Sequence, residues 1–104
     1  MNLKNLSVKE YCETQSIPTL KKPVNAYWAL PCGEIMAFFY FLERNFNYKC
    51  RNGIHYLTLG PVQISGFVVR NEVGEPFLNC TANVPKSILS DILYTILNEY
   101  RETM

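Results

Sequence analysis

Two stretches of the chain carry apolar residues at the spacing of an α-helix. Between residues 85 and 102 the apolar side chains fall at intervals of three and four and form one stripe, made up of Ile88, Leu89, Ile92, Leu93, Ile96, Leu97 and Tyr100. This pattern predicts an amphipathic helix, and Pro85 suits its first turn. Residues 33–47 are apolar on several sides, which predicts a central helix buried on more than one face.

The beginning of the chain predicts a short helix over residues 7–16. Ser7 is followed three positions later by Glu10, the spacing of a capping box, in which each side chain satisfies a backbone N–H at the helix start. Pro18 lacks the backbone N–H that a helix needs, so the helix should end before it.

Four segments are typical of β-strands: residues 24–30, 54–59, 62–71 and 77–84. The last segment alternates cleanly, with Leu78, Cys80 and Ala82 on one side. Residues 71–75 contain Gly74 and predict a hairpin turn. The alternation in 62–71 shifts phase near Ser65-Gly66, which predicts a β-bulge there.

These elements predict an α+β fold: a small three- or four-stranded antiparallel sheet with two main helices packed on one face and a short N-terminal helix. No repeat, low-complexity segment or linker divides the sequence. We therefore expect a single domain over residues 1–104.

Composition narrows the class of function. Of the 104 residues 48% are hydrophobic, enough for a core without a metal. The net charge of +1 provides no broad attraction for nucleic acid or anionic lipid. The apolar stretch 26–42 is interrupted by Pro31, Gly33 and Glu34, too soon to span a bilayer. We expect no membrane association and no glycine-loop cofactor site, because the five glycines are scattered.

The four cysteines indicate a reducing compartment. No two of them are spaced as Cys-x-x-Cys, which argues against both a disulfide scaffold and a structural metal site. The first seven residues contain no apolar segment of a secretory signal. The sequence predicts reduced thiols and a cytoplasmic location.

One pair of residues suggests catalysis. Cys32 precedes the central helix, and a helix N-terminus stabilises a thiolate. His55, the only histidine, lies on a predicted strand and would serve as its base. The competing interpretation is that Cys32 is a small residue at a tight turn and His55 an ordinary sheet residue.

The aromatic content favours a different function. Seven tyrosines and one tryptophan exceed what a small core needs, and such residues are enriched at interfaces. Candidate interface residues are Tyr27, Trp28, Tyr56, Tyr94 and Tyr100. The alternative is that they line the rim of the core with the phenol outward.

The sequence therefore favours a non-catalytic protein–protein interaction or regulatory module that binds a protein partner or itself as a homodimer. An accessory protein of a bacterium or mobile genetic element would fit this architecture, by analogy with other small domains. A thiol-dependent enzyme using Cys32 and His55 is the alternative, and a small nucleic-acid-binding domain is the third hypothesis.

Overall fold

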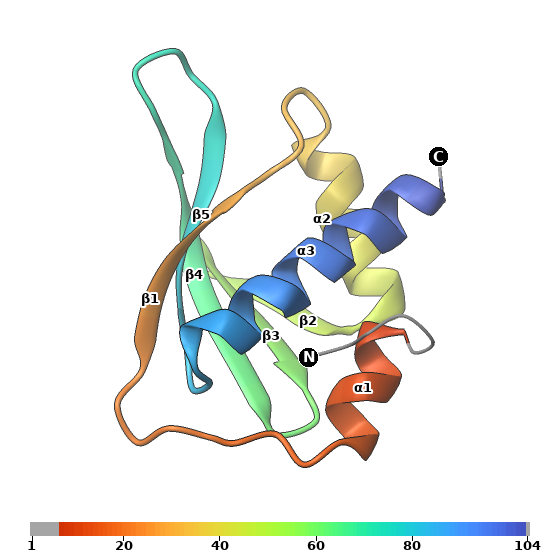
Figure 1. The fold of residues 1–104 in the computed structure, drawn as a ribbon. Helices are drawn as coiled ribbons and strands as arrows, with labels where there is room; N and C mark the ends of the chain where they lie inside the picture. Colours follow the sequence, from red (N-terminus) through yellow and green to blue (C-terminus); the bar gives the residue numbers. More distant parts are fainter. Residues whose placement is uncertain (1–6, 104) are drawn as a thin grey trace.

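The computed structural model describes residues 7–103 and has one antiparallel sheet with helices against one side (Figure 1). The strand order across the sheet is β1-β5-β4-β3-β2. Along the chain the elements are α1 (Val8–Thr14), β1 (Val24–Ala29), α2 (Ile35–Asn45), β2 (Asn47–Arg51), β3 (Ile54–Leu59), β4 (Val62–Arg70), β5 (Pro76–Ala82) and α3 (Lys86–Glu102). The expected absence of a secretory signal rests on residues 1–7, of which residues 1–6 lie outside the described part.

The α+β class with an antiparallel sheet is confirmed, but the predicted three or four strands are wrong, because the sheet has five. The strand that was missed is β2, whose residues are mostly exposed and polar. It forms one edge of the sheet and has no apolar alternation, so the sequence pattern assigned its start to the preceding helix. Phe46 ends that helix in an extended conformation, and β2 follows directly.

All three helices lie on the same side of the sheet (Figure 1). The predicted stripe of α3 is confirmed over most of its length: Ile88, Leu89, Ile92, Leu93, Ile96 and Tyr100 are buried. At its far end α3 is tied to α2, because the Tyr100 hydroxyl donates a hydrogen bond of 3.0 Å to Glu34, the N-cap residue of α2.

The helix α1 begins as predicted. The Ser7 hydroxyl accepts a hydrogen bond from the Glu10 backbone N–H, and the Glu10 carboxylate accepts one from the Ser7 N–H. The helix packs closely on the β3–β4 turn, where a Cβ on Gly60 would lie only 2.5 Å from the Cys12 carbonyl oxygen. Gly60 also has a φ of +58°, so both the turn and the contact require glycine.

The predicted bulge in β4 is wrong, because the pairing of β4 with both neighbours runs without interruption. Gly66 takes an inward position at which a Cβ would lie 2.5 Å from the Asn79 carbonyl oxygen. The next residue, Phe67, points outward. Because Gly66 is small and faces inward while Phe67 is large, apolar and faces outward, the sequence pattern changes here although the strand alternates regularly.

The core fills the space between the sheet and the helices. Phe38 of α2 is its centre: the ring is fully buried and packs edge-on against Trp28 at 5.3 Å and against Tyr100 at 5.2 Å. Edge-to-face contacts of this kind stabilise aromatic clusters beyond the area that they bury. No charged or polar residue among the described positions is buried, so the core depends on apolar packing.

Candidate functional site

The face of the sheet opposite the helices is bare in the monomer. Strand alternation and pairing place on it the side chains of Asn25, Tyr27, Ala29, Ile54, Tyr56, Thr58, Gln63, Ser65, Phe67, Val69, Phe77, Asn79 and Thr81 from β1, β3, β4 and β5, together with Asn47, Lys49 and Arg51 from the edge strand β2. We call this set the open face. None of its residues on the four strands β1, β3, β4 and β5 carries a charge.

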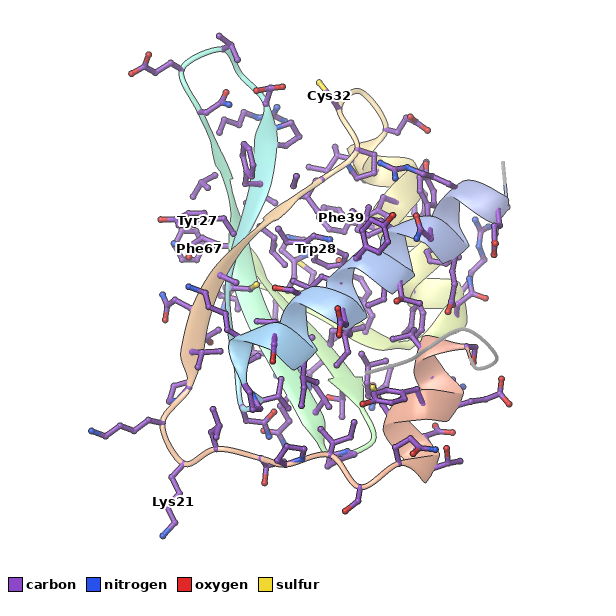
Figure 2. All side chains as sticks on the ribbon, viewed as in Figure 1. Lys21, Tyr27, Trp28, Cys32, Phe39 and Phe67 are labelled. Carbon is purple, nitrogen blue, oxygen red and sulfur yellow. The ribbon has the colours of Figure 1, made fainter. Side chains whose placement is uncertain are left out.

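One half of the open face is apolar. Tyr27 and Phe67 both flank Asn79 across the sheet, and the next row joins Ala29, Phe77 and Val69. The Tyr27 side chain is 69% exposed and that of Phe67 is 44% exposed. Figure 2 shows both rings projecting from the side of the sheet away from the helices. A large aromatic pair in this position exposes apolar area that soluble monomers usually keep small.

The other half of the open face is polar and hollowed. A depression of about 420 Å³ is lined by Tyr56, Ser65, Thr81, Asn83 and Lys49, among others. The Lys49 ammonium lies 5.9 Å from the centre of the Tyr56 ring, a cation–π contact. The hydroxyl groups of Ser65 and Thr81 lie 3.3 Å apart across β4 and β5. This half therefore offers hydrogen-bonding groups beside the apolar half.

The five predicted interface residues fall into two groups. Tyr27 and Tyr56 lie on the open face, and Tyr94 is exposed on α3. Trp28 and Tyr100, by contrast, are 4% and 5% exposed and belong to the core. Figure 2 shows Trp28 pointing toward the helices while the neighbouring Tyr27 points the opposite way, as adjacent strand residues must. A partner on the surface would not reach Trp28 or Tyr100.

The two predicted thiol-enzyme residues are held by different parts of the fold. Cys32 is exposed in the loop between β1 and α2, three residues before the first helical residue. Its side chain points outward from the loop tip (Figure 2). His55 lies on β3, and no hydrogen bond joins it to Cys32 in the described chain. The predicted base therefore has other partners.

The partners of His55 come from β2 and α2. Its Nδ1 lies 2.8 Å from the Tyr48 hydroxyl, and its Nε2 lies 3.9 Å from the Cys50 sulfur. The Phe39 ring stacks on the imidazole at a centroid distance of 4.3 Å. We call Cys50, His55 and Tyr48 the thiol–imidazole cluster. Cys50 is exposed on the edge strand and His55 is half-buried beneath Phe39.

Burial determines the charge states around His55. It lowers the pKa of the imidazole, so the ring is neutral at neutral pH. Burial, helped by the charges of Cys50 and Glu43, raises the pKa of the Tyr48 phenol to about 12. A neutral phenol beside a neutral imidazole fixes the orientation of the ring without forming an ion pair.

Sequence reasoning missed Cys50 and Tyr48, although a signal was present. Asn52-Gly53 is a typical two-residue hairpin turn, and both residues have the positive φ that such a turn needs. The turn pairs Arg51 with Ile54 and then Cys50 with His55. Residues directly opposite in an antiparallel pair bring their Cβ atoms to about 5 Å, so the turn by itself places the thiol beside the imidazole.

Two other classes of site, a metal centre and a membrane-spanning helix, are not found among residues 7–103. Residues 7–103 contain no group of three or more His, Cys, Asp or Glu side chains arranged to hold a metal ion. Over the same range, no helix combines the length and apolar character needed to cross a membrane. All four cysteines are free thiols, two of them buried and two exposed.

Comparison of the chain with known protein families, with curated proteins and with solved structures found no match.

Proposed function

We propose that the protein acts by non-catalytic protein–protein contact and that its first partner is a second copy of itself, bound through the open face. The observation that carries this proposal is the combination of exposed aromatics and absent charge on four adjacent strands. Interface centres are depleted of charged residues and enriched in Tyr and Phe. Tyr27 and Phe67 supply the aromatic anchors, and the hydroxyl-bearing half of the face supplies polar contacts.

A second copy suits this surface better than other occupants. The open face carries only two cations, Lys49 and Arg51 on its edge strand β2, so its attraction for the phosphates of nucleic acid or for a strongly acidic peptide is weak. A copy of the chain presents the same partly apolar surface, which is free of charge on four of its five strands, and the net charge of +1 gives little repulsion between copies. Two-fold contact is also the commonest symmetry of soluble oligomers.

The size of the open face is adequate for such a dimer. Five strands about 4.8 Å apart, with about six residues each at about 3.4 Å, make a face of roughly 20 by 20 Å. Two such faces cover about 800 Å² in plan, and the relief of the side chains increases the accessible area. A specific interface needs about 1,000 Å² in total, so nearly the whole open face would take part.

Sedimentation equilibrium over a micromolar concentration series tests the proposal. The wild-type chain should form a reversible dimer. The double variant Tyr27→Ser/Phe67→Ser should raise the dissociation constant by about 30-fold, since truncating interface aromatics costs about 2 kcal/mol or more. The matched control is Tyr94→Ser, which removes a tyrosine of similar exposure, 65%, from the helical side of the molecule.

Two results would contradict the proposal. A wild-type chain that remains monomeric throughout the series would remove the dimer. Equal weakening by Tyr94→Ser and by the double variant would show that the copies associate through another surface.

A further inference from the structure

The proposed dimer does not involve one chemically active group of residues, which lies on the side of the sheet opposite the open face. The thiol–imidazole cluster brings a nucleophile and a base within reach of each other, with a third residue orienting the base. Cys50 Sγ and His55 Nε2 are 3.9 Å apart, and Tyr48 holds the other ring nitrogen at 2.8 Å. This is the arrangement by which proteins activate a cysteine nucleophile.

We propose that Cys50 is a reactive thiol, with His55 as the acceptor of its proton, and that it exchanges with small disulfides such as oxidised glutathione. The proposal is separate from dimer formation, because the cluster uses the helix-facing side of β2 and β3, at the sheet edge, rather than the open face.

The hydrogen-bond pattern around His55 suits the role of proton acceptor. When Nδ1 carries the proton of the neutral ring and donates it to the Tyr48 oxygen, the lone pair of Nε2 faces Cys50. The Tyr48 oxygen accepts the same hydrogen bond after His55 becomes charged, so the ring keeps its orientation during proton transfer. Phe39 covers the ring face and limits its rotation, with a centroid distance of 4.3 Å.

The charges near Cys50 act in both directions. Lys49 and Arg51 flank it along the edge strand and attract an anionic reagent. Their side chains leave from the other face of the sheet, and Lys49 is engaged with Tyr56, so they act at longer range than His55. Together with burial, Glu43 of α2 helps to raise the pKa of the Tyr48 phenol. Burial lowers the pKa of the His55 imidazole and so opposes its uptake of a proton. The close contact with His55 is thus the main source of activation.

The exchange step balances without a further reagent. The Cys50 S–H proton moves to His55 Nε2, and the thiolate attacks one sulfur of the disulfide. A new S–S bond joins Cys50 to one half of the reagent while the original S–S bond breaks. The other half leaves as a thiolate and takes the proton from His55 to become a free thiol. The product is a mixed disulfide on an exposed edge strand.

The chain contains its own control thiols. Cys32 is exposed like Cys50 but has no histidine contact in the described chain. Cys12 and Cys80 are fully buried, and burial raises the pKa of each thiol to about 11. These two should remain protonated and unmodified in the folded protein at neutral pH.

The test is the rate at which each cysteine of the reduced full chain forms a mixed disulfide with oxidised glutathione, followed by peptide mass spectrometry. Cys50 should react about tenfold faster than Cys32 or more, a modest part of the about 100-fold that a positioned base contributes. His55→Gln should reduce the Cys50 rate to that of Cys32 and leave Cys32 unchanged. Tyr48→Phe should slow Cys50 less, because it removes only the group that orients the ring.

A Cys50 rate equal to or below that of Cys32 in the wild-type chain would overturn the proposal, and this comparison needs no variant. So would an unchanged Cys50 rate in His55→Gln, once circular dichroism shows that the variant is folded. If His55→Gln does not fold, Tyr48→Phe decides, since an unchanged rate there contradicts the orienting role. The open-face variants should leave the Cys50 rate unaltered, so failure of the dimer and failure of the thiol site are distinguishable.

Discussion

The two faces of the sheet differ although the same strands build both. On the helix side Trp28, Leu78 and Ile64 are nearly inaccessible and belong to the hydrophobic core. On the open side Tyr27 and Phe67 occupy the neighbouring positions and remain largely exposed. Apolar side chains therefore point to both faces of the sheet, and the chain's own helices cover only one of these faces. The difference between the faces is therefore the main support for the proposed dimer.

Removing the central aromatic residue should show the largest difference between the faces. Phe38→Ala empties the middle of the core and should lower the free energy of unfolding by about 3–5 kcal/mol, a large part of the about 5–15 kcal/mol of a typical domain. Phe67→Ala removes the same ring from the open face and should cost the monomer about 1 kcal/mol or less. Urea unfolding at low protein concentration measures both. Similar losses from the two substitutions would mean that the open face is not bare in the monomer.

Alkaline pH should destabilise the folded protein through the buried thiols of Cys12 and Cys80 on the helix side of the sheet. Their pKa is about 11 in the folded chain, against an ordinary value of 9.0. Between these values the unfolded chain has lost thiol protons that the folded chain keeps, so stability is complete below about pH 9 and falls as pH rises. Each thiol should remove about 2–3 kcal/mol by about pH 11.

The matched variants for this effect are Cys12→Ala and Cys32→Ala. Urea unfolding in buffers of increasing pH should give a shallower loss of stability for Cys12→Ala and the wild-type slope for Cys32→Ala, because Cys32 is exposed. Burial also raises the pKa of Tyr11, Tyr48 and Tyr100, so stability will still fall with pH in Cys12→Ala. An unchanged slope in Cys12→Ala would contradict the burial of that thiol.

A smaller effect is expected where β4 and β5 approach each other. Gly66→Ala places a Cβ against the Asn79 carbonyl oxygen and the Cys80 backbone, at 2.5 and 2.8 Å. The strands must shift, which should cost about 1–3 kcal/mol. The control is Ser65→Ala, the adjacent outward residue, which loses only a part-buried hydroxyl contact of 3.3 Å with Thr81 and should cost less. If thermal unfolding shows that Ser65→Ala is less stable than Gly66→Ala, β4 and β5 do not approach closely at Gly66. This result would contradict the uninterrupted register of β4.

Much of this fold could be predicted because several elements carry strong periodic patterns. The α3 stripe and the alternation of β5 come from burial on one side, which the sequence records directly. The edge strand β2 has little burial and so leaves no such pattern. The pattern of β4 wrongly predicted a bulge for a related reason: an apolar residue such as Phe67 is expected inside, but here it lies on the open face.

The candidate sites were predictable only in part. Exposed aromatics such as Tyr27 and core aromatics such as Trp28 are adjacent in sequence, and only the register with β5 decides which one faces the helices. The pairing of Cys50 with His55 depends on a strand that was missed, although Asn52-Gly53 implied it. Contacts across a sheet follow from register, and a single sequence states register clearly only at tight turns.

The most direct test of the account is hydroxyl-radical footprinting of the unmodified chain as a function of its concentration. The central claim is that the open face binds a second copy. Oxidation of Tyr27 and Phe67 should fall as the concentration rises through the dimer dissociation constant. Oxidation of Tyr94 on α3 and of Tyr40, an exposed residue of α2, should stay constant. Constant oxidation of Tyr27 and Phe67, or protection of Tyr94 instead, would contradict the claim.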